Sequence, residues 1–189
     1  MFLLKNKYFL IIQNTKDLNL KNIKKYNKFI IIYRNKYNDE NITQIKEFRK
    51  KCKLKSIKFY VANNKDLAIK INADGLYMSA HNRSLKSLFL KKNNFNIIGS
   101  AHNMKEIVFK KNQGCSYILL SKLFLVDYDK KKSFLGTIKF NQISKNTSKI
   151  IALGGIKSQN LNSIRNVNCD GIAILSEVKK KPAIISRLF

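Results

Sequence analysis

Short apolar runs recur along the chain, separated by longer stretches that are rich in lysine and asparagine. Each run has four or five residues, most of them Ile, Leu, Val, Phe or Tyr, and the runs cover 8–12, 29–33, 57–61, 75–78, 96–99, 117–120, 149–153 and 171–175. Unbroken apolar runs are typical of strands that are buried on both faces of a parallel sheet. The pattern therefore predicts eight parallel strands.

Amphipathic patterns lie between several of these runs. Ile42, Ile45, Phe48 and Cys52 recur every three or four positions with charged residues between them, which predicts a helix with one buried face. Further helices are predicted at 64–71, 82–91, 103–111 and 158–167. Each begins with a residue whose side chain can cap a helix: Asn64, Asn82, Asn103 and Ser158.

Three similar turns connect a helical segment to the next strand. The turns at 72–75, 114–117 and 168–171 begin with Asn or Gly, which suit a left-handed residue at the end of a helix. Repeated helix–turn–strand units indicate alternating β and α structure. Eight of them predict a single domain over residues 1–189, a compact (β/α)8 TIM barrel of the α/β class. A doubly wound open sheet is the alternative.

Barrels of this type carry their active sites at the carboxyl ends of the strands. After the seventh predicted strand stand Gly154 and Gly155, whose backbone N–H groups can face an anion together with the start of the next helix. With Ser176 beyond the eighth strand they predict a phosphate-binding cup, and an ordinary tight turn is the alternative. Arg34 follows the second strand, where it can contact a phosphate or diphosphate or can simply be solvated.

Polar residues follow other predicted strands as well. Asn63, Asn82 and Ser100 come after the third, fourth and fifth strands, and their side chains suit hydrogen bonds to a ligand as well as ordinary loops. The longest connection, 121–136, follows the sixth strand and contains a run of lysines. Its length and charge predict a lid that closes over an anion, with a solvated basic loop as the alternative.

The chain is strongly basic, with 38 Lys+Arg against 11 Asp+Glu and a formal charge of +27. Only five of the basic residues are arginine, and Lys, Asn and Ile together make up 81 of the 189 residues, as expected from a genome rich in A and T. Nucleic-acid surfaces favour arginine. We therefore attribute the charge mainly to nucleotide composition and do not expect nucleic acid as a partner. A selected polyanion-binding surface is the alternative.

Cysteine and histidine are scarce. Cys52, Cys115 and Cys169 lie far apart without CxxC spacing, and the two histidines are His81 and His102. This pattern predicts neither a disulfide framework nor a Cys/His metal site. No run of 18 apolar residues and no convincing signal peptide is present, so we expect a cytoplasmic protein without a membrane segment.

Four passages resemble one known family in order and spacing. They are NADGL at 72–76, GSAH at 99–102, ALGGI at 152–156 and CDGIAILS at 169–176. These are similar to the GADGVH, GxSxH, AIGGI and ADGVAVVS passages of the thiamine phosphate synthase/TenI family. The resemblance covers nearly the whole chain. It implies a (β/α)8 barrel and an enzyme of thiamine biosynthesis, a transferase that joins hydroxymethylpyrimidine diphosphate to thiazole phosphate and releases pyrophosphate with Mg²⁺.

The resemblance also implies roles for particular residues. The matching catalytic and substrate-binding positions are Arg34, Lys36, Ser100, Lys130, Gly154, Gly155 and Ser176. The three basic residues would engage the diphosphate, and Lys130 matches the lid only if one residue is inserted. The two glycines and Ser176 would hold the thiazole phosphate, and Ser100 would contact substrate. The Gln that accompanies the Arg and Lys in the family is lost.

Two departures concern the metal. Asn63 and Asn82 occupy the positions of the family's magnesium-binding carboxylates, and an amide oxygen is a poorer ligand for a hard cation. Mg²⁺ is retained as a candidate cofactor whose two expected ligands are absent, and the two asparagines are expected to contact substrate. A TenI-like enzyme is one alternative, with Lys122 at the position of the tautomerase's catalytic His. A non-catalytic protein that binds thiazole phosphate or thiamine phosphate is the other.

Overall fold

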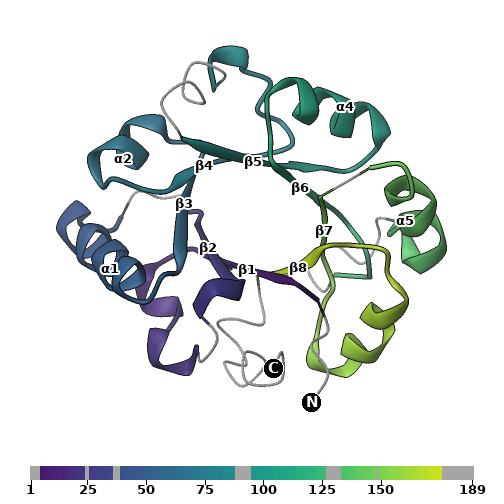
Figure 1. Ribbon diagram of the computed structural model, residues 1–189, viewed down its shortest axis with the longest axis horizontal. Helices are drawn as coiled ribbons and strands as arrows, with labels where there is room; N and C mark the ends of the chain where they lie inside the picture. Colours follow the sequence, from purple (N-terminus) through teal and green to yellow (C-terminus); the bar gives the residue numbers. More distant parts are fainter. Residues whose placement is uncertain are drawn as a thin grey trace.

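Eight parallel strands close into a barrel that is surrounded by helices (Figure 1). The computed structural model describes residues 5–23, 26–35, 39–87, 95–126, 133–147 and 149–175. Each strand pairs in parallel with the next, and β8 pairs with β1 to complete the ring, which confirms the predicted (β/α)8 barrel. The strands are β1 Lys7–Ile12, β2 Phe29–Tyr33, β3 Lys58–Ala62, β4 Gly75–Met78, β5 Asn96–Ala101, β6 Tyr117–Leu120, β7 Ile150–Leu153 and β8 Gly171–Ile174.

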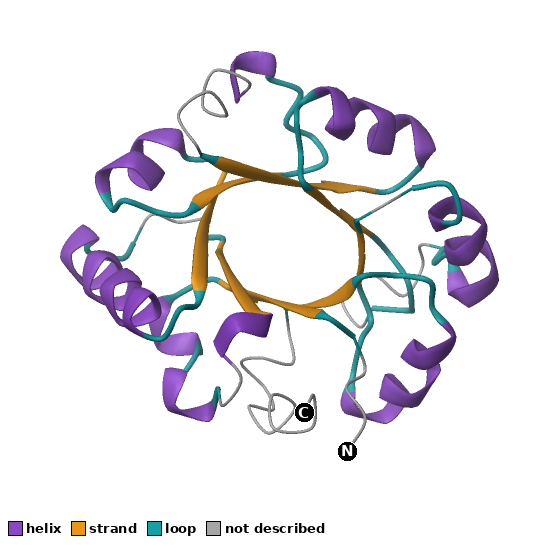
Figure 2. Cartoon of the chain, in the orientation of Figure 1, coloured by secondary structure: helices purple, strands orange, loops and turns teal. Residues whose placement is uncertain are grey.

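The connections carry helices on the outside of the ring (Figure 2). The α-helices are α1 Ile42–Leu54, α2 Lys65–Lys70, α4 Met104–Asn112 and α5 Gly136–Ser144. Short 3₁₀ helices are η1 Thr15–Asp17, η2 Leu20–Asn22, η3 Tyr26–Lys28, η4 Leu85–Ser87 and η5 Ser158–Asn166. Within the described ranges, none of these helices is both long enough and apolar enough to cross a membrane.

The strands are buried on both faces, which explains their unbroken apolar runs. Alternate residues of a strand point to opposite sides of the sheet. In β1, Phe9 and Ile11 belong to the cluster inside the barrel, whereas Tyr8 and Leu10 belong to the cluster between the sheet and the helices. The inner cluster also contains Ile30, Ile32, Tyr60, Tyr77, Ile98, Leu119, Ile151 and Ala173.

The helix α1 buries the face that its periodicity predicts. Ile45, Phe48 and Cys52 are buried, and Asn41 caps the helix by accepting a hydrogen bond from Thr43 N. The buried Arg49 on the same helix forms a 3.0 Å ion pair with Asp74. That carboxylate also accepts a 2.7 Å hydrogen bond from Phe59 N, so the aspartate of the NADGL passage ties α1 to the barrel.

Several local predictions differ from the structure. The helix predicted at 82–91 is described only as η4, because 88–94 lie outside the described residues, and Asn82 bonds Ser84 N in a turn before it. The predicted helix at 158–167 is the 3₁₀ helix η5, and Lys157, not Ser158, is its N-cap.

A left-handed residue was predicted at the start of three turns, and two of the three have a positive φ. Asn72 has φ +52° and Gly114 has φ +77°, whereas Asn168 is not among the described residues with positive φ. The helix α5 has no counterpart in the sequence prediction. It lacks a side-chain cap at Leu135, and its Ile138 is exposed, so the amphipathic pattern is weak there.

Candidate functional site

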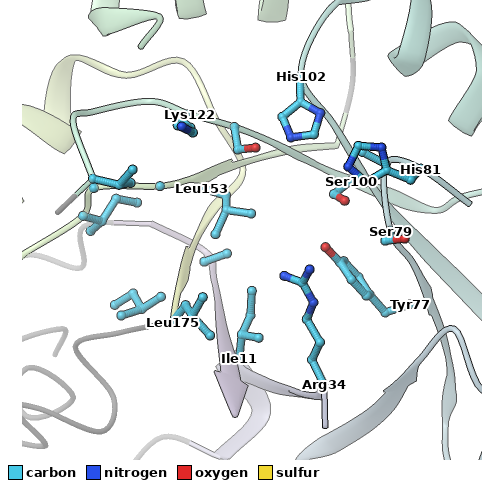
Figure 3. A pocket seen from close by; sticks show the side chains of 18 residues that line it. Ile11, Arg34, Tyr77, Ser79, His81, Ser100, His102, Lys122, Leu153 and Leu175 are labelled. Carbon is cyan, nitrogen blue, oxygen red and sulfur yellow. The ribbon is translucent and has the colours of Figure 1, made fainter. Parts of the chain in front are cut away.

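A cavity of about 190 Å³ opens at the carboxyl ends of the strands (Figure 3). Apolar side chains, including Ile11, Leu153 and Leu175, cover one side of it. The polar groups come from the ends of different strands: Arg34, Tyr77, Ser79, His81, Ser100, His102, Ser121 and Lys122. None of the 18 lining residues, all from the described part of the chain, is an Asp or Glu. The cavity therefore suits an anionic ligand with an apolar part.

Arg34 lies where the sequence predicts it, one residue beyond β2. Its backbone N–H donates a 2.8 Å hydrogen bond to Ile12 O, which continues the pairing of β2 with β1. The guanidinium points into the cavity beside the Tyr77 hydroxyl (Figure 3). Within the described residues no carboxylate forms an ion pair with Arg34. A half-buried arginine without such a partner can receive the charge of a phosphate or diphosphate.

Tyr77 lines the cavity and was not among the site residues predicted from the sequence. It is buried on the inner face of β4, and its side chain forms a hydrogen bond with Ser100, which the sequence did predict as a site residue. Burial raises the pKa of Tyr77, against the hydrogen bond from Ser100 and the positive charge of Arg34. The available signal was a polar-tipped aromatic residue near the carboxyl end of an apolar strand, at an inward position.

The paired glycines adopt backbone conformations that favour glycine. Gly154 has φ +99° and Gly155 has φ +68°. A Cβ atom on Gly155 would lie 2.4 Å from Leu125 O and 2.5 Å from Phe124 O, so the turn packs directly on the segment after β6. Phe124 N also donates a 3.0 Å hydrogen bond to Gly154 O. Both glycines line the cavity, whereas Ser176, predicted to complete the phosphate cup, lies outside the described residues.

The two ends of the predicted lid are joined through the backbone. Leu135 N donates to Lys122 O at 2.8 Å, and Gly136 N donates to Leu123 O at 2.9 Å. Lys122 lines the cavity from the first of these ends. Lys130 in the middle of this connection lies outside the described residues, as does Lys36 after β2. Closure of the connection over a ligand stays a prediction.

Asn63 and Asn82 form one hydrogen-bonded group beside the cavity. Asn63 Oδ1 accepts 3.1 Å and 3.0 Å hydrogen bonds from Asn82 Nδ2 and Ser79 N, and Asn63 Nδ2 donates to Ser79 Oγ. Asn82 Oδ1 accepts a hydrogen bond from Ser84 N. Neither asparagine is among the lining residues, although Ser79 and His81 are. The structure thus brings the two predicted residues into contact with each other. Their contact with substrate stays a prediction.

A buried lysine holds the loop that carries this group. Lys110 on α4 is fully buried, and its Nζ donates hydrogen bonds of 2.7 Å to Ser79 O and to Asn82 O and one of 2.8 Å to Gln113 Oε1. Gln113 Nε2 donates to Asn82 O and to Ser84 O. Burial lowers the pKa of Lys110. These contacts fix the loop after β4 against α4.

The residues described here do not fit a magnesium site. Magnesium prefers anionic oxygen ligands, and the amide oxygens of Asn63 and Asn82 already accept hydrogen bonds from neighbouring N–H groups. No cluster of three or more His, Cys, Asp or Glu side chains exists among the described residues. Asp127 and Asp129 lie outside them.

The sequence is similar to those of thiamine-phosphate synthases. A family model described as thiamine monophosphate synthase matches residues 13–178. A thiamine-phosphate synthase of Prochlorococcus marinus is 28% identical over 153 residues, which are 79% of this chain and 44% of that protein. One of Bacillus cereus (strain B4264) is 26% identical over 143 residues, which are 74% and 65% of the two chains. This chain spans about two fifths of the length of the Prochlorococcus relatives it matches.

Solved structures share the barrel fold. A thiamine phosphate pyrophosphorylase from Pyrococcus furiosus superposes with a TM-score of 0.70 at 16% identity, over 97% of each chain. A 3-hexulose-6-phosphate synthase superposes with a TM-score of 0.71 at 12% identity, over 96% of this chain and 97% of the other. At these identities the likeness concerns the fold alone.

Proposed function

Because the chain belongs to the thiamine monophosphate synthase family, we propose that it joins hydroxymethylpyrimidine diphosphate to thiazole phosphate and forms thiamine phosphate. One observation carries the proposal. Arg34 points, without a carboxylate partner in the described chain, into a cavity that Gly154 and Gly155 also line. A cation and a turn of two glycines that line one cavity suit two phosphorylated substrates.

The reaction exchanges one bond for another. The C–O bond between the pyrimidine methylene group and the diphosphate breaks, and the electron pair leaves with the pyrophosphate. The lone pair of the thiazole nitrogen then forms the new C–N bond, and no proton has to move. The protein must therefore hold two anions, bring the nitrogen to the carbon and stabilise the departing negative charge.

The chain's residues divide these tasks. Arg34, with Lys36 and Lys130, would bind the diphosphate, and Gly154 and Gly155, with Ser176, would bind the thiazole phosphate. Ser100 would hydrogen-bond the substrate from the end of β5, and its bond to Tyr77 supports a fixed orientation of its hydroxyl group. The apolar side of the cavity would cover the rings.

A second candidate is a protein that binds the same phosphates without catalysis. The hydrogen bond between Asn63 and Asn82 favours it, because the family's metal-binding carboxylates are replaced by a pair of amides that bond each other. The two candidates share the cavity and differ in turnover. Product formation therefore separates them.

The test is an assay of purified protein with hydroxymethylpyrimidine diphosphate, thiazole phosphate and Mg²⁺, in which thiamine phosphate and pyrophosphate are quantified. Arg34→Gln should lower kcat/KM by about 100-fold, since it removes charge-assisted hydrogen bonds. Arg165→Gln, on the exposed side of η5, is the matched control and should leave the rate unchanged. Binding of thiazole phosphate without any product would support the non-catalytic candidate.

A further inference from the structure

A carboxylate fixes one imidazole ring at the edge of the cavity. His102 follows β5 directly, and its ring Nδ1 lies 3.0 Å from Glu106 Oε2. The same oxygen accepts a 2.8 Å hydrogen bond from His102 N. Asn103 Oδ1 accepts a 3.0 Å hydrogen bond from Glu106 N, and Asn103 Nδ2 lies 3.4 Å from Glu106 Oε1. The first turn of α4 thus holds the carboxylate, and the carboxylate holds the ring.

This arrangement determines which ring nitrogen is left for a ligand. Burial alone would raise the pKa of Glu106, but the hydrogen bonds from the His102 backbone and ring, with the charges of His102 and His81, lower it. An ionised carboxylate only accepts hydrogen bonds, so Nδ1 is the donor toward Glu106. The other nitrogen, Nε2, is then the one left for a ligand, and it donates a hydrogen bond to an anion when the ring carries both protons.

The surroundings of the ring favour an anion. His81 lies beside His102, with the ring centres 6.1 Å apart, and both rings line the cavity that Arg34 enters (Figure 3). Lys122 adds a further positive charge to the lining. The carboxylate of Glu106, on the far side of the His102 ring, is already bonded to His102.

We propose that His102, positioned by Glu106, donates a hydrogen bond from Nε2 to the diphosphate group of the substrate. This rests on the proposed function and adds to it a binding residue. It also names a positive charge that can replace the metal beside the diphosphate. With amides at positions 63 and 82, the negative charge of the diphosphate is balanced by Arg34 and by an imidazolium held in place by a carboxylate. No divalent cation is then required for the diphosphate to bind.

The simpler alternative is that Glu106 only caps α4. A glutamate at this position commonly accepts a hydrogen bond from the backbone before a helix, as Glu106 does from His102 N. Capping does not require the ring of His102 to face a cavity or to lie beside a second imidazole. The variant Glu106→Gln keeps an oxygen that can cap the helix and removes the charge behind the imidazole, so it separates the two roles.

Binding of inorganic pyrophosphate in EDTA, measured by calorimetry, tests the proposal. Raised salt suppresses non-specific binding to the lysine-rich surface. His102→Gln should weaken binding about 10-fold or more, and Glu106→Gln should weaken it by about 3- to 10-fold, in line with charge-assisted hydrogen bonds. Glu47→Gln, which removes an exposed carboxylate from α1, is the matched control and should change the affinity by less than about twofold.

Imidazole ¹⁵N spectra give a readout that a capping role would not move. The chain has two histidines, so each ring can be assigned by comparison with the His81→Gln and His102→Gln variants. Addition of pyrophosphate in EDTA should shift the His102 Nε2 signal toward that of a protonated, hydrogen-bonded ring. In Glu106→Gln this shift should be reduced, although the helix stays folded.

Two results would overturn the proposal: no binding of pyrophosphate by the wild-type protein in EDTA, or equal affinity in wild type and His102→Gln. Neither decides the proposed function, because thiamine phosphate formation is measured separately with Mg²⁺ present. Conversely, pyrophosphate binding through His102 without any product would contradict the synthase activity and leave this inference standing.

Discussion

Asn82 Nδ2 donates a 3.1 Å hydrogen bond to Asn63 Oδ1, which links the loops after β4 and β3. Asn63 has φ +55°, a left-handed conformation that asparagine tolerates better than most residues. The pair therefore has a structural role that needs neither a negative charge nor a metal. The resemblance to the family predicts magnesium-binding carboxylates at these two positions.

Aspartate at both positions should convert this contact into a repulsion. In the variant Asn63→Asp/Asn82→Asp two carboxylates would stand where the amides now bond, and the hydrogen bond between them would be lost. In EDTA we expect a loss of about 1–3 kcal/mol in the free energy of unfolding. Mg²⁺ should recover much of it, as measured by urea unfolding with and without the metal.

The control for this variant is Asn162→Asp, an exposed position on η5. Its stability should change by less than about 0.5 kcal/mol and should not respond to Mg²⁺. Equal stability of the double variant and wild type in EDTA would contradict the structural role assigned to the pair.

Gly155→Ala should be far more damaging than Gly136→Ala. Both residues have nearly the same positive φ, +68° and +67°, but a Cβ at Gly136 meets nothing closer than 4.0 Å. Gly136→Ala should therefore cost only the left-handed backbone conformation, about 1–2 kcal/mol. Gly155→Ala adds a clash with the carbonyl groups of Phe124 and Leu125, for roughly 1–3 kcal/mol more.

The same pair of variants probes ligand binding. If the turn at Gly155 holds a phosphate, thiazole phosphate affinity should fall in Gly155→Ala and stay near that of wild type in Gly136→Ala, as judged by calorimetry. Identical unfolding curves for the two variants would show that the close approach of Phe124 and Leu125 does not constrain the turn.

Lys110→Met should destabilise the loop after β4. It removes the three hydrogen bonds that Nζ donates, and the buried Gln113 Oε1 is left without this donor. We expect a loss of about 2–4 kcal/mol in the free energy of unfolding. The neighbouring Lys111→Met is the control: Lys111 is exposed, and its change should stay within about 0.5 kcal/mol.

Acid should weaken the contribution of Glu106 to the free energy of unfolding. Its pKa is lower in the folded protein than its ordinary value of 4.5, so the folded state binds fewer protons than the unfolded state just below that pH. The stabilisation is fully present above the unfolded pKa and disappears as the pH falls through the folded one. Urea unfolding between about pH 6 and about pH 3 should show the stability gap between wild type and Glu106→Gln shrinking with acid. A constant gap would contradict this.

Most of the barrel could be predicted from the sequence because the strands are buried on both faces. The run 8–12, for example, alternates between the two clusters, so each of its positions needs an apolar side chain. The helix α5 escaped prediction because Leu135 provides no side-chain cap and Ile138 is exposed. Likewise the Asn- and Ser-rich segment 158–166 keeps its predicted position but is wound as a 3₁₀ helix.

The candidate site was predictable only where strand ends alone determine it. Arg34, Ser100, Gly154 and Gly155 could be picked by that rule, and all four line the cavity. Contacts across the barrel could not be found in this way. Tyr77 gains its role from Ser100 on the next strand, and Lys110 reaches from α4 to the loop after β4, 31 residues earlier in the chain.

The synthase activity is tested by thiamine phosphate formation from the two phosphorylated substrates, followed over a magnesium titration that begins in EDTA. Product is expected at every magnesium concentration, with a rate that changes by less than about 10-fold, because Arg34 and His102 balance charge that a metal otherwise balances. Product only in the presence of Mg²⁺ would keep the synthase and contradict the expectation that protein cations alone balance the charge of the leaving pyrophosphate. No product at any magnesium concentration, with both substrates intact, would contradict the synthase activity itself.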